Sequence, residues 1–183
     1  MTENNNARIR ELIARISRIM AAEEWKDEIN PSQWAALSYL AEANRFSRAP
    51  SQVAEYMSAT RGTVSQTLKT LARKGFIEEV RSDTDKRSIS YTVTKKGKKF
   101  VEQRQALEDA FHLPDEALAT ALVQGLETLV RNALRRRGQR PFGVCETCAH
   151  NRKSTDGWFC DLLQEPLKSN EIKQLCHEHT ESA

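Results

Sequence analysis

The sequence lacks any hydrophobic run of membrane-spanning length, and its first residues lack the apolar core of a signal peptide. It also lacks a Ser-His-Asp arrangement, a phosphate-binding glycine loop and a paired-carboxylate site. These absences argue against a membrane protein and against an enzyme. With 183 residues, 39% of them hydrophobic and 29% charged, we expect a cytoplasmic globular protein with one medium domain and a small appendage.

The charge of the chain is unevenly distributed, although the net charge is only +3. Residues 60–104 carry 12 basic and 5 acidic side chains, so this segment is +7 and the rest of the chain is −4. Concentrated positive charge suits salt-dependent binding to the phosphates of a nucleic acid. A solvated helix face is the alternative, because most lysine-rich runs simply face water.

The segment 60–74, TRGTVSQTLKTLARK, has the pattern of an amphipathic helix. A hydroxyl residue precedes the pattern as a possible N-cap, and Gly75 follows where a helix would end in a left-handed residue. The apolar face consists of Val64, Leu68 and Leu71. The other faces carry mostly short polar side chains, which reach base edges in a major groove without clashing. They are Thr63, Ser65, Gln66, Thr67 and Lys69.

The neighbouring segments complete a larger motif. Pro50–Met57 has a short helical pattern, and a turn of small residues separates it from the helix at 60–74. Two strand-like runs follow, 76–81 and 88–94. Short helix, turn, second helix and β-hairpin predict a winged helix-turn-helix, in which the second helix lies in a major groove and the hairpin reaches the minor groove.

Residues 7–137 resemble the MarR family of dimeric transcriptional regulators. The resemblance rests on the helix start NPSQWAAL at 30–37 and on the run 50–75. It also rests on the wing sequence SDTDKR at 82–87 and on VTKKG at 93–97.

The resemblance implies an obligate dimer, of repressor type, that binds double-stranded DNA at a pseudo-palindromic operator. The contacts would come from the recognition helix 60–74 and the wing 76–94. Arg87 would enter the minor groove, and Asp85 would help to hold the wing in shape. The residues expected at the DNA are Thr60, Arg61, Thr63, Ser65, Gln66, Lys69, Asp85, Lys86 and Arg87.

The remaining helices are predicted from caps and apolar stripes. We expect residues 1–6 to be disordered and residues 7–25 to form a long helix, and we expect Asn30 to cap a helix that ends near Glu42. Further helices are expected at Lys95–Phe111 and from Asp115 to Gly138. The first and last helices are expected to form the dimerisation layer, with any small-molecule effector left unidentified.

The predicted fold class is therefore mainly α with a small β wing (α+β). Residues 7–140 form the winged-helix and dimerisation domain, and residues 141–183 form a Cys-rich module outside the resemblance. Arg45 and Arg48 lie in a loop before the helix-turn-helix, where they are expected to contact phosphates or to remain plain surface residues.

All four cysteines lie in the last quarter of the chain, with the spacing C-x2-C-x11-C-x15-C: Cys145, Cys148, Cys160 and Cys176. Thiols stay reduced in the cytoplasm, so this cluster predicts a metal site more than disulfides. Zinc would use four thiolates, or three with His177 or His179. A [4Fe-4S] cluster is the alternative cofactor, and four free or redox-active thiols are the simplest reading. The site is expected to be structural or sensory.

Two other functions are compatible with parts of the sequence. The Cys145–Cys148 pair would suit a C-x-x-C thiol oxidoreductase, but the sequence shows no βαβ unit to carry it. A protein-interaction adaptor would use a winged helix that no longer binds DNA. Arg87 and the polar face of the recognition helix argue against the adaptor.

Overall fold

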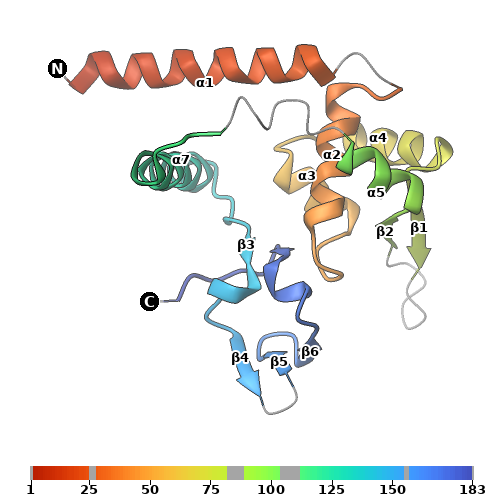
Figure 1. The fold of residues 1–183 in the computed structure, drawn as a ribbon. Helices are drawn as coiled ribbons and strands as arrows, with labels where there is room; N and C mark the ends of the chain where they lie inside the picture. Colours follow the sequence, from red (N-terminus) through yellow and green to blue (C-terminus); the bar gives the residue numbers. More distant parts are fainter. Residues whose placement is uncertain (1, 25–27, 82–88, 104–111, 155–156, 183) are drawn as a thin grey trace.

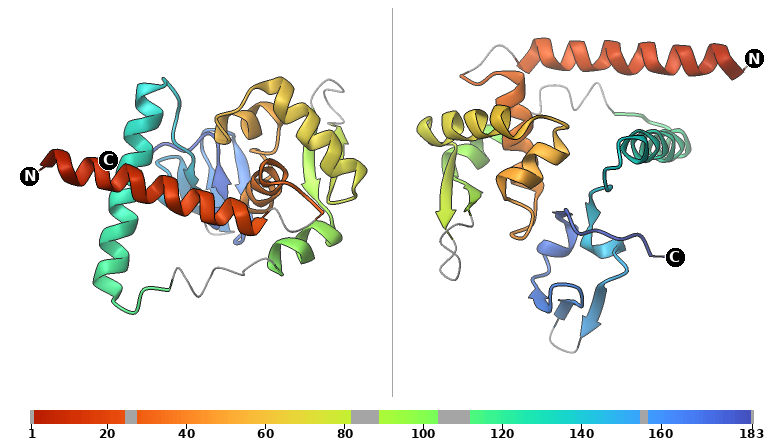
Figure 2. Two further views of the ribbon diagram at one scale, coloured as in Figure 1. Left: turned by 90° about the horizontal axis from the view of Figure 1, so that it is seen from above. Right: turned by 180° about the vertical axis from the view of Figure 1, so that it is seen from behind.

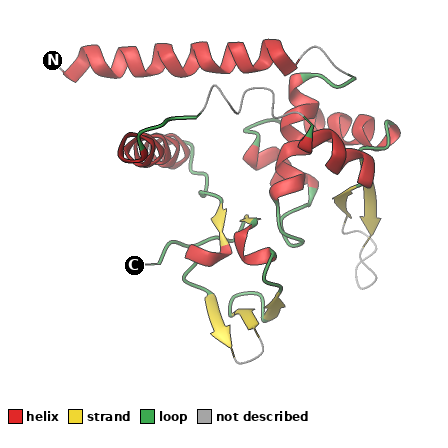
Figure 3. Cartoon of the chain, viewed as in Figure 1, coloured by secondary structure: helices red, strands yellow, loops and turns green. Residues whose placement is uncertain are grey.

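The computed structural model describes residues 2–24, 28–81, 89–103, 112–154 and 157–182. Helices dominate, and the strands are confined to a hairpin and to the C-terminal part of the chain (Figure 3). The predicted class, mainly α with a small β wing, is confirmed in its predominance of helices and its hairpin, and the C-terminal part of the chain adds small antiparallel sheets that were not predicted. Within the described residues, no helix combines the length and the apolarity that crossing a membrane requires.

Six helices and seven strands are described, and Figure 1 labels most of them. The helices are α1 (Thr2–Glu24), α2 (Pro31–Glu42), α3 (Pro50–Tyr56), α4 (Arg61–Arg73), α5 (Lys95–Glu102) and α7 (Glu116–Arg136). The strands are β1 (Ile77–Arg81), β2 (Ile89–Val93), β3 (Gly143–Val144), β4 (Asn151–Ser154), β5 (Gly157–Cys160), β6 (Glu165–Leu167) and β7 (Leu175–Cys176). Short 3-10 helices span Cys145–Thr147 and Glu171–Lys173.

The start of α2 matches the prediction in detail. The Asn30 side chain accepts the backbone N–H of Gln33 at 2.9 Å, and the Gln33 side chain accepts the backbone N–H of Asn30 at 3.4 Å. Pro31 occupies the first helical position, where the absence of its N–H costs no hydrogen bond. This capping box therefore fixes where α2 begins.

Helices α2, α3 and α4 pack around one apolar core against the hairpin β1–β2. Leu37, Val53, Leu68 and Phe76 are fully buried in it. Gly97 in α5 has no room for a side chain, because a Cβ there would collide with the carbonyl oxygen of Phe76. The close approach of α5 to the start of β1 thus depends on this glycine.

Helix α1 begins earlier than predicted. Residues 1–6 were expected to be disordered, but α1 is helical from Thr2 onward. The reason is that each residue added to an existing helix gains a hydrogen bond, and the sequence from 2 to 6 contains no Gly or Pro to end it. Of the helix predicted over Lys95–Phe111, the described part is α5, and residues 104–111 lie outside the described residues.

Helices α1 and α7 extend away from the winged helix and cross each other in the view from above (Figures 1 and 2). Asp115 caps α7 by accepting the N–H groups of Ala117 and Leu118, and α7 has no buried residue. The apolar side chains of α1 are between 37% and 50% exposed: Ile9, Leu12, Ile13, Ile16, Ile19 and Met20. Those of α7 are similarly open: Leu118, Leu122, Val123, Leu126, Leu129 and Val130.

The C-terminal module (residues 141–182) consists of short strands and turns. Strands β4, β5 and β6 form one antiparallel sheet, and β3 pairs with β7. The module packs on the winged helix through Phe142, whose ring lies against Tyr39 and Tyr56 at centroid distances of 5.8 and 5.3 Å.

Candidate nucleic-acid interface and cysteine cluster

Helix α4 separates its apolar and polar faces as the sequence predicted. Val64, Leu68 and Leu71 are buried, and the Thr60 hydroxyl caps the helix by accepting the N–H of Thr63 at 3.2 Å. The side chains of Arg61, Gln66 and Lys69 are exposed, and within the described part of the chain they form no hydrogen bond or ion pair that holds them to the fold. They are therefore available to a ligand.

Three predicted polar positions of α4 differ from a simple exposed face. Thr67 is buried, and its hydroxyl donates to the carbonyl of Thr63 at 3.0 Å, so it belongs to the packed side of the helix. Ser65 is half-buried. The hydroxyls of Thr60 and Thr63 lie 2.9 Å apart and bond to each other. Both hydroxyls therefore stabilise the start of α4, in addition to any contact that they make with a ligand.

The wing consists of β1 and β2, in a register that pairs Ile77 with Val93 and Arg81 with Ile89. Gly75 precedes it with φ of 76°, the left-handed conformation predicted for the end of α4. The tip of the wing, with the predicted contacts Asp85, Lys86 and Arg87, lies outside the described residues.

Arg45 and Arg48 are not plain surface residues, because both make hydrogen bonds within the chain, and a phosphate contact of either stays a prediction. The Arg45 guanidinium lies 2.7 Å from each carboxylate oxygen of Glu171 in the C-terminal module. The Arg48 guanidinium donates twice to the carbonyl of Ala43, at 2.9 and 2.8 Å. Sequence reasoning missed both roles because the Arg45 partner lies 126 positions away and the Arg48 partner is a backbone group.

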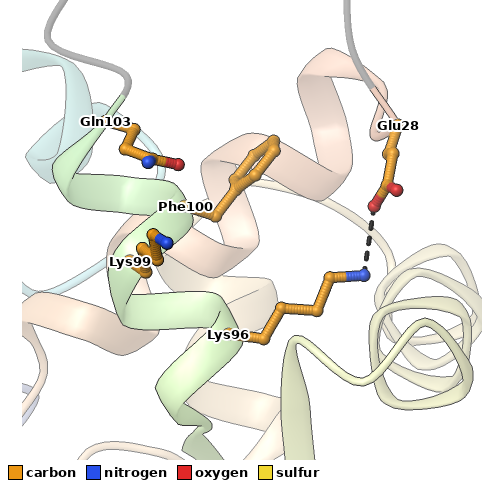
Figure 4. A pocket seen from close by; sticks show the side chains of 5 residues that line it. All are labelled: Glu28, Lys96, Lys99, Phe100 and Gln103. Atoms are coloured by element: carbon orange, nitrogen blue, oxygen red, sulfur yellow. Dashed lines mark hydrogen bonds and ion pairs between the residues drawn. The ribbon is translucent and has the colours of Figure 1, made fainter.

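A surface pocket of about 400 Å³ lies beside α5 (Figure 4). It is lined by Glu28, Lys96, Lys99, Phe100 and Gln103. Lys96 lies 3.1 Å from the Glu28 carboxylate, so one of the two cations already has a partner within the chain. A small-molecule effector for this pocket stays a prediction.

The four cysteines are all free and buried, and they line one small cavity. The turn Cys145–Thr147 carries the first of them, β5 ends at Cys160, and β7 ends at Cys176. The cavity has a volume of about 10 Å³. That is room for about one water-sized occupant. His150, Asn151 and Glu178 complete its polar lining, and the Asn151 side-chain oxygen is buried without a hydrogen-bond partner.

Cys145 and Cys176 form a hydrogen-bonded pair. The Cys145 thiol lowers the pKa of Cys176 to about 6, an effect to which Asn44, the backbone N–H of Glu178 and Ser47 also contribute. The pKa of Cys145 is raised, first by its hydrogen bond with Cys176 and then by burial. The hydrogen bond between the two sulfurs thus shifts the two pKa values in opposite directions.

The two histidines proposed as replacement ligands turn away from the cavity. Nε2 of His177 lies 2.9 Å from the Glu55 carboxylate of α3, and Nε2 of His179 lies 3.1 Å from the Thr147 hydroxyl. His150 lines the cavity instead. Sequence reasoning did not select His150, although its position two residues after Cys148 is the signal that would have pointed to it.

The chemistry of the donor set fits a thiolate-bound metal, because four cysteines converge on one cavity. Their arrangement is not that of a formed site. In the described residues, no group of three or more His, Cys, Asp or Glu side chains is arranged to hold an ion.

The packing of α3 and α4 against the hairpin β1–β2 defines a winged helix-turn-helix fold. Residues 28–88, a stretch that includes α2, α3 and α4, match the family model described as MarR family. Among curated proteins, none matches the chain.

Solved structures share the fold over most of their own length. Streptococcus pneumoniae FabT in complex with DNA matches with a TM-score of 0.58 and 22% identity, over 73% of this chain and 97% of FabT. The S. aureus MepR–DNA complex matches with a TM-score of 0.55 and 22% identity, over 67% and 96% of the two chains. The transcriptional regulator BldR from Sulfolobus solfataricus matches with a TM-score of 0.57 and 16% identity, over 72% of this chain and 99% of BldR. The family and fold matches are to transcription regulators rather than enzymes.

Proposed function

We propose that this protein is a dimeric DNA-binding transcriptional regulator of the MarR type, a repressor that binds a pseudo-palindromic operator. The DNA-binding part of the proposal rests on the face of α4 that carries Arg61, Gln66 and Lys69. These side chains are exposed because the apolar face of the helix is buried against the core. A rigid helix that presents such side chains fits a major groove. The match of residues 28–88 to the MarR family model supports this proposal.

The dimer is proposed from the apolar faces of α1 and α7. Both faces stand open to water in a single chain. Contiguous exposed apolar surface of this kind marks an interaction site. Because the two helices extend away from the winged helix, a second copy on them leaves both α4 helices accessible (Figure 2). The division into residues 7–140 for DNA binding and dimerisation and residues 141–183 for the Cys-rich module belongs to the same proposal.

We further propose that the four cysteines hold one zinc ion, with a [4Fe-4S] cluster as the alternative. Support comes from the four cysteines that line one cavity, since four thiolates are a common ligand set of structural zinc sites. A bound zinc ion supplies a cross-link that holds a small module folded. The residues of this chain supply the thiolates and the hydrogen bonds around them.

The DNA-binding proposal is tested by selection of duplex DNA from a random library with the full-length protein. We expect an enriched sequence with two related half-sites whose centres lie about one helical turn apart. A folded protein that enriches no sequence contradicts the proposal. A single, unrepeated half-site contradicts the dimer but not the DNA contact.

The metal proposal is tested on protein purified without air, by elemental analysis and absorbance. About one zinc per chain and no visible colour is expected for a four-thiolate site. Iron with sulfide in a brown protein supports the cluster instead. Protein that contains neither metal and takes up neither on addition leaves four free thiols as the correct reading.

A further inference from the structure

The α2–α3 loop (residues 43–49) supplies polar groups to the cysteine cluster from outside the C-terminal module. The Asn44 side chain is fully buried and donates to the sulfur of Cys145 at 3.5 Å. Ser47 is also fully buried, and its hydroxyl bonds to the sulfur of Cys176. Two of the four sulfurs are therefore hydrogen-bonded by one loop that lies about 100 positions earlier in the chain.

The same loop is attached to the module through its backbone. The Asn44 N–H donates to the carbonyl of Leu175 at 2.9 Å, and Ala43 forms a parallel bridge with Leu175. The N–H of His177 donates to the Ser47 hydroxyl at 2.8 Å. Leu175 and His177 flank Cys176, so the position of this cysteine and the position of the loop are fixed together.

On its other side, the loop contacts the DNA-binding elements. The Gln52 side chain in α3 donates to the carbonyl of Phe46 at 2.9 Å, and the N–H of Tyr91 in β2 donates to the carbonyl of Arg48 at 3.1 Å. His177 also reaches Glu55 of α3 directly. Helix α3 packs on α4, so the loop lies between the cysteine cluster and the recognition helix.

We propose that metal binding at the four cysteines and DNA binding at α4 are energetically coupled through the α2–α3 loop, so that the metal-loaded protein binds DNA more tightly. The inference rests on the proposed function and adds its regulation. A metal ion bound by Cys145 and Cys176 fixes the positions of these two residues, and with them the contacts that the loop makes through Asn44 and Ser47. The strengthened loop holds α3 and β2 in place, and a preorganised helix-turn-helix binds with less loss of entropy.

The coupling is tested by measuring the affinity of the full-length protein for its selected DNA, with zinc and with zinc removed by a chelator. We expect about tenfold tighter binding with zinc, within the usual range of such couplings. Coupling is reciprocal, so bound DNA must raise the affinity for zinc by the same factor. Metal-free protein that binds DNA as tightly as the loaded protein, or more tightly, overturns the inference.

Two variants locate the coupling, one in the loop and one in the direct contact between the C-terminal module and α3. Ser47→Ala removes the hydroxyl at Cys176, and Glu55→Ala removes the contact of α3 with His177. Both are expected to keep the zinc stoichiometry and to lose most of the zinc-dependent gain in DNA affinity. Ser51→Ala is the matched control, because Ser51 is an exposed residue of α3 outside the loop. A full zinc effect in Ser47→Ala overturns the loop as the route, and a full zinc effect in Glu55→Ala overturns the direct contact with α3.

The measurements separate failure of the coupling from failure of the proposed function. Absence of zinc binding removes the metal site and the coupling together. Absence of any selected DNA sequence removes the regulator itself. Zinc and DNA that both bind, each with an affinity independent of the other, overturn the coupling alone.

Discussion

At the scale of single residues, Arg45 carries much of the attachment between the winged helix and the C-terminal module. Besides both oxygens of Glu171, its guanidinium reaches the carbonyl of Pro166 at 2.9 Å. Glu171 is only 6% exposed, and its other hydrogen bond comes from the N–H of Lys168. Arg45 is therefore the cation in direct contact with this carboxylate, while Arg48 interacts with it at longer range.

Arg45→Ala is expected to lower the free energy of unfolding by about 2 kcal/mol, because it leaves a buried carboxylate without its cation. Urea unfolding followed by circular dichroism measures the change. Arg152→Ala is the control, since its ion pair with Asp161 is exposed and contributes less than about 1 kcal/mol. An equal decrease in the free energy of unfolding of the two variants would show that the contact with Arg45 does not stabilise the buried Glu171 carboxylate.

Gln66→Ala is expected to relax sequence preference at one base position by about 1–3 kcal/mol, because a side chain at a base edge discriminates between bases. Lys69→Ala is expected instead to weaken binding to all sequences and to reduce the salt slope by about one. Titrations of the selected DNA and its point variants at several salt concentrations distinguish the two. Gln103→Ala serves as the control, because Gln103 is an exposed residue directly after α5, and wild-type behaviour of both α4 variants contradicts the placement of α4.

Residues whose environment is set locally were predictable from the sequence. The cap at Thr60 and the buried Val64, Leu68 and Leu71 follow from helical period alone. Thr67 could not be placed, because its burial depends on how α4 rests against α2 and α3. Asn44 and Ser47 carried no signal at all, since their partners are 101 and 130 positions away.

At the scale of elements, α5 packs closely against the start of the hairpin because Gly97 has no side chain. Gly97→Ala is expected to destabilise the protein by about 1–3 kcal/mol, because the added methyl group meets the Phe76 backbone. Gly62→Ala in α4 is the matched control. The nearest atom to its added Cβ lies 4.0 Å away, so it is expected to stabilise by about 0.5–1 kcal/mol. In thermal unfolding, the midpoint temperature is expected to be lower than that of the wild type for Gly97→Ala and higher for Gly62→Ala.

Elements with strong terminal signals were predicted to within a residue or two. Helix α2 has a capping box and a proline at its start, and α4 ends at a left-handed glycine. The strands of the C-terminal module were not predicted, because strands of two to four residues have too little period to recognise. Their pairing is fixed by contacts between distant segments, such as Gly143 with Cys176.

At the scale of the whole molecule, the apolar faces of α1 and α7 predict how the chain assembles. Ile16→Glu is expected to raise the dissociation constant of the dimer by about a hundredfold, because it places a charge in an apolar interface at a cost of about 3 kcal/mol. Sedimentation measures this constant directly. Ala14→Glu lies on the opposite face of α1 and is expected to leave assembly unchanged, and equal effects of the two would remove α1 from the interface.

The bridge between Ala43 and Leu175 has a consequence for the order in which the protein matures on the ribosome. When α2, α3 and α4 have emerged, the residues that fasten the loop between them have not yet been translated. At roughly 5–20 residues per second, the chain needs on the order of ten seconds to reach Leu175. A nascent chain therefore carries an unfastened helix-turn-helix until the residues around Leu175 have emerged and paired with Ala43.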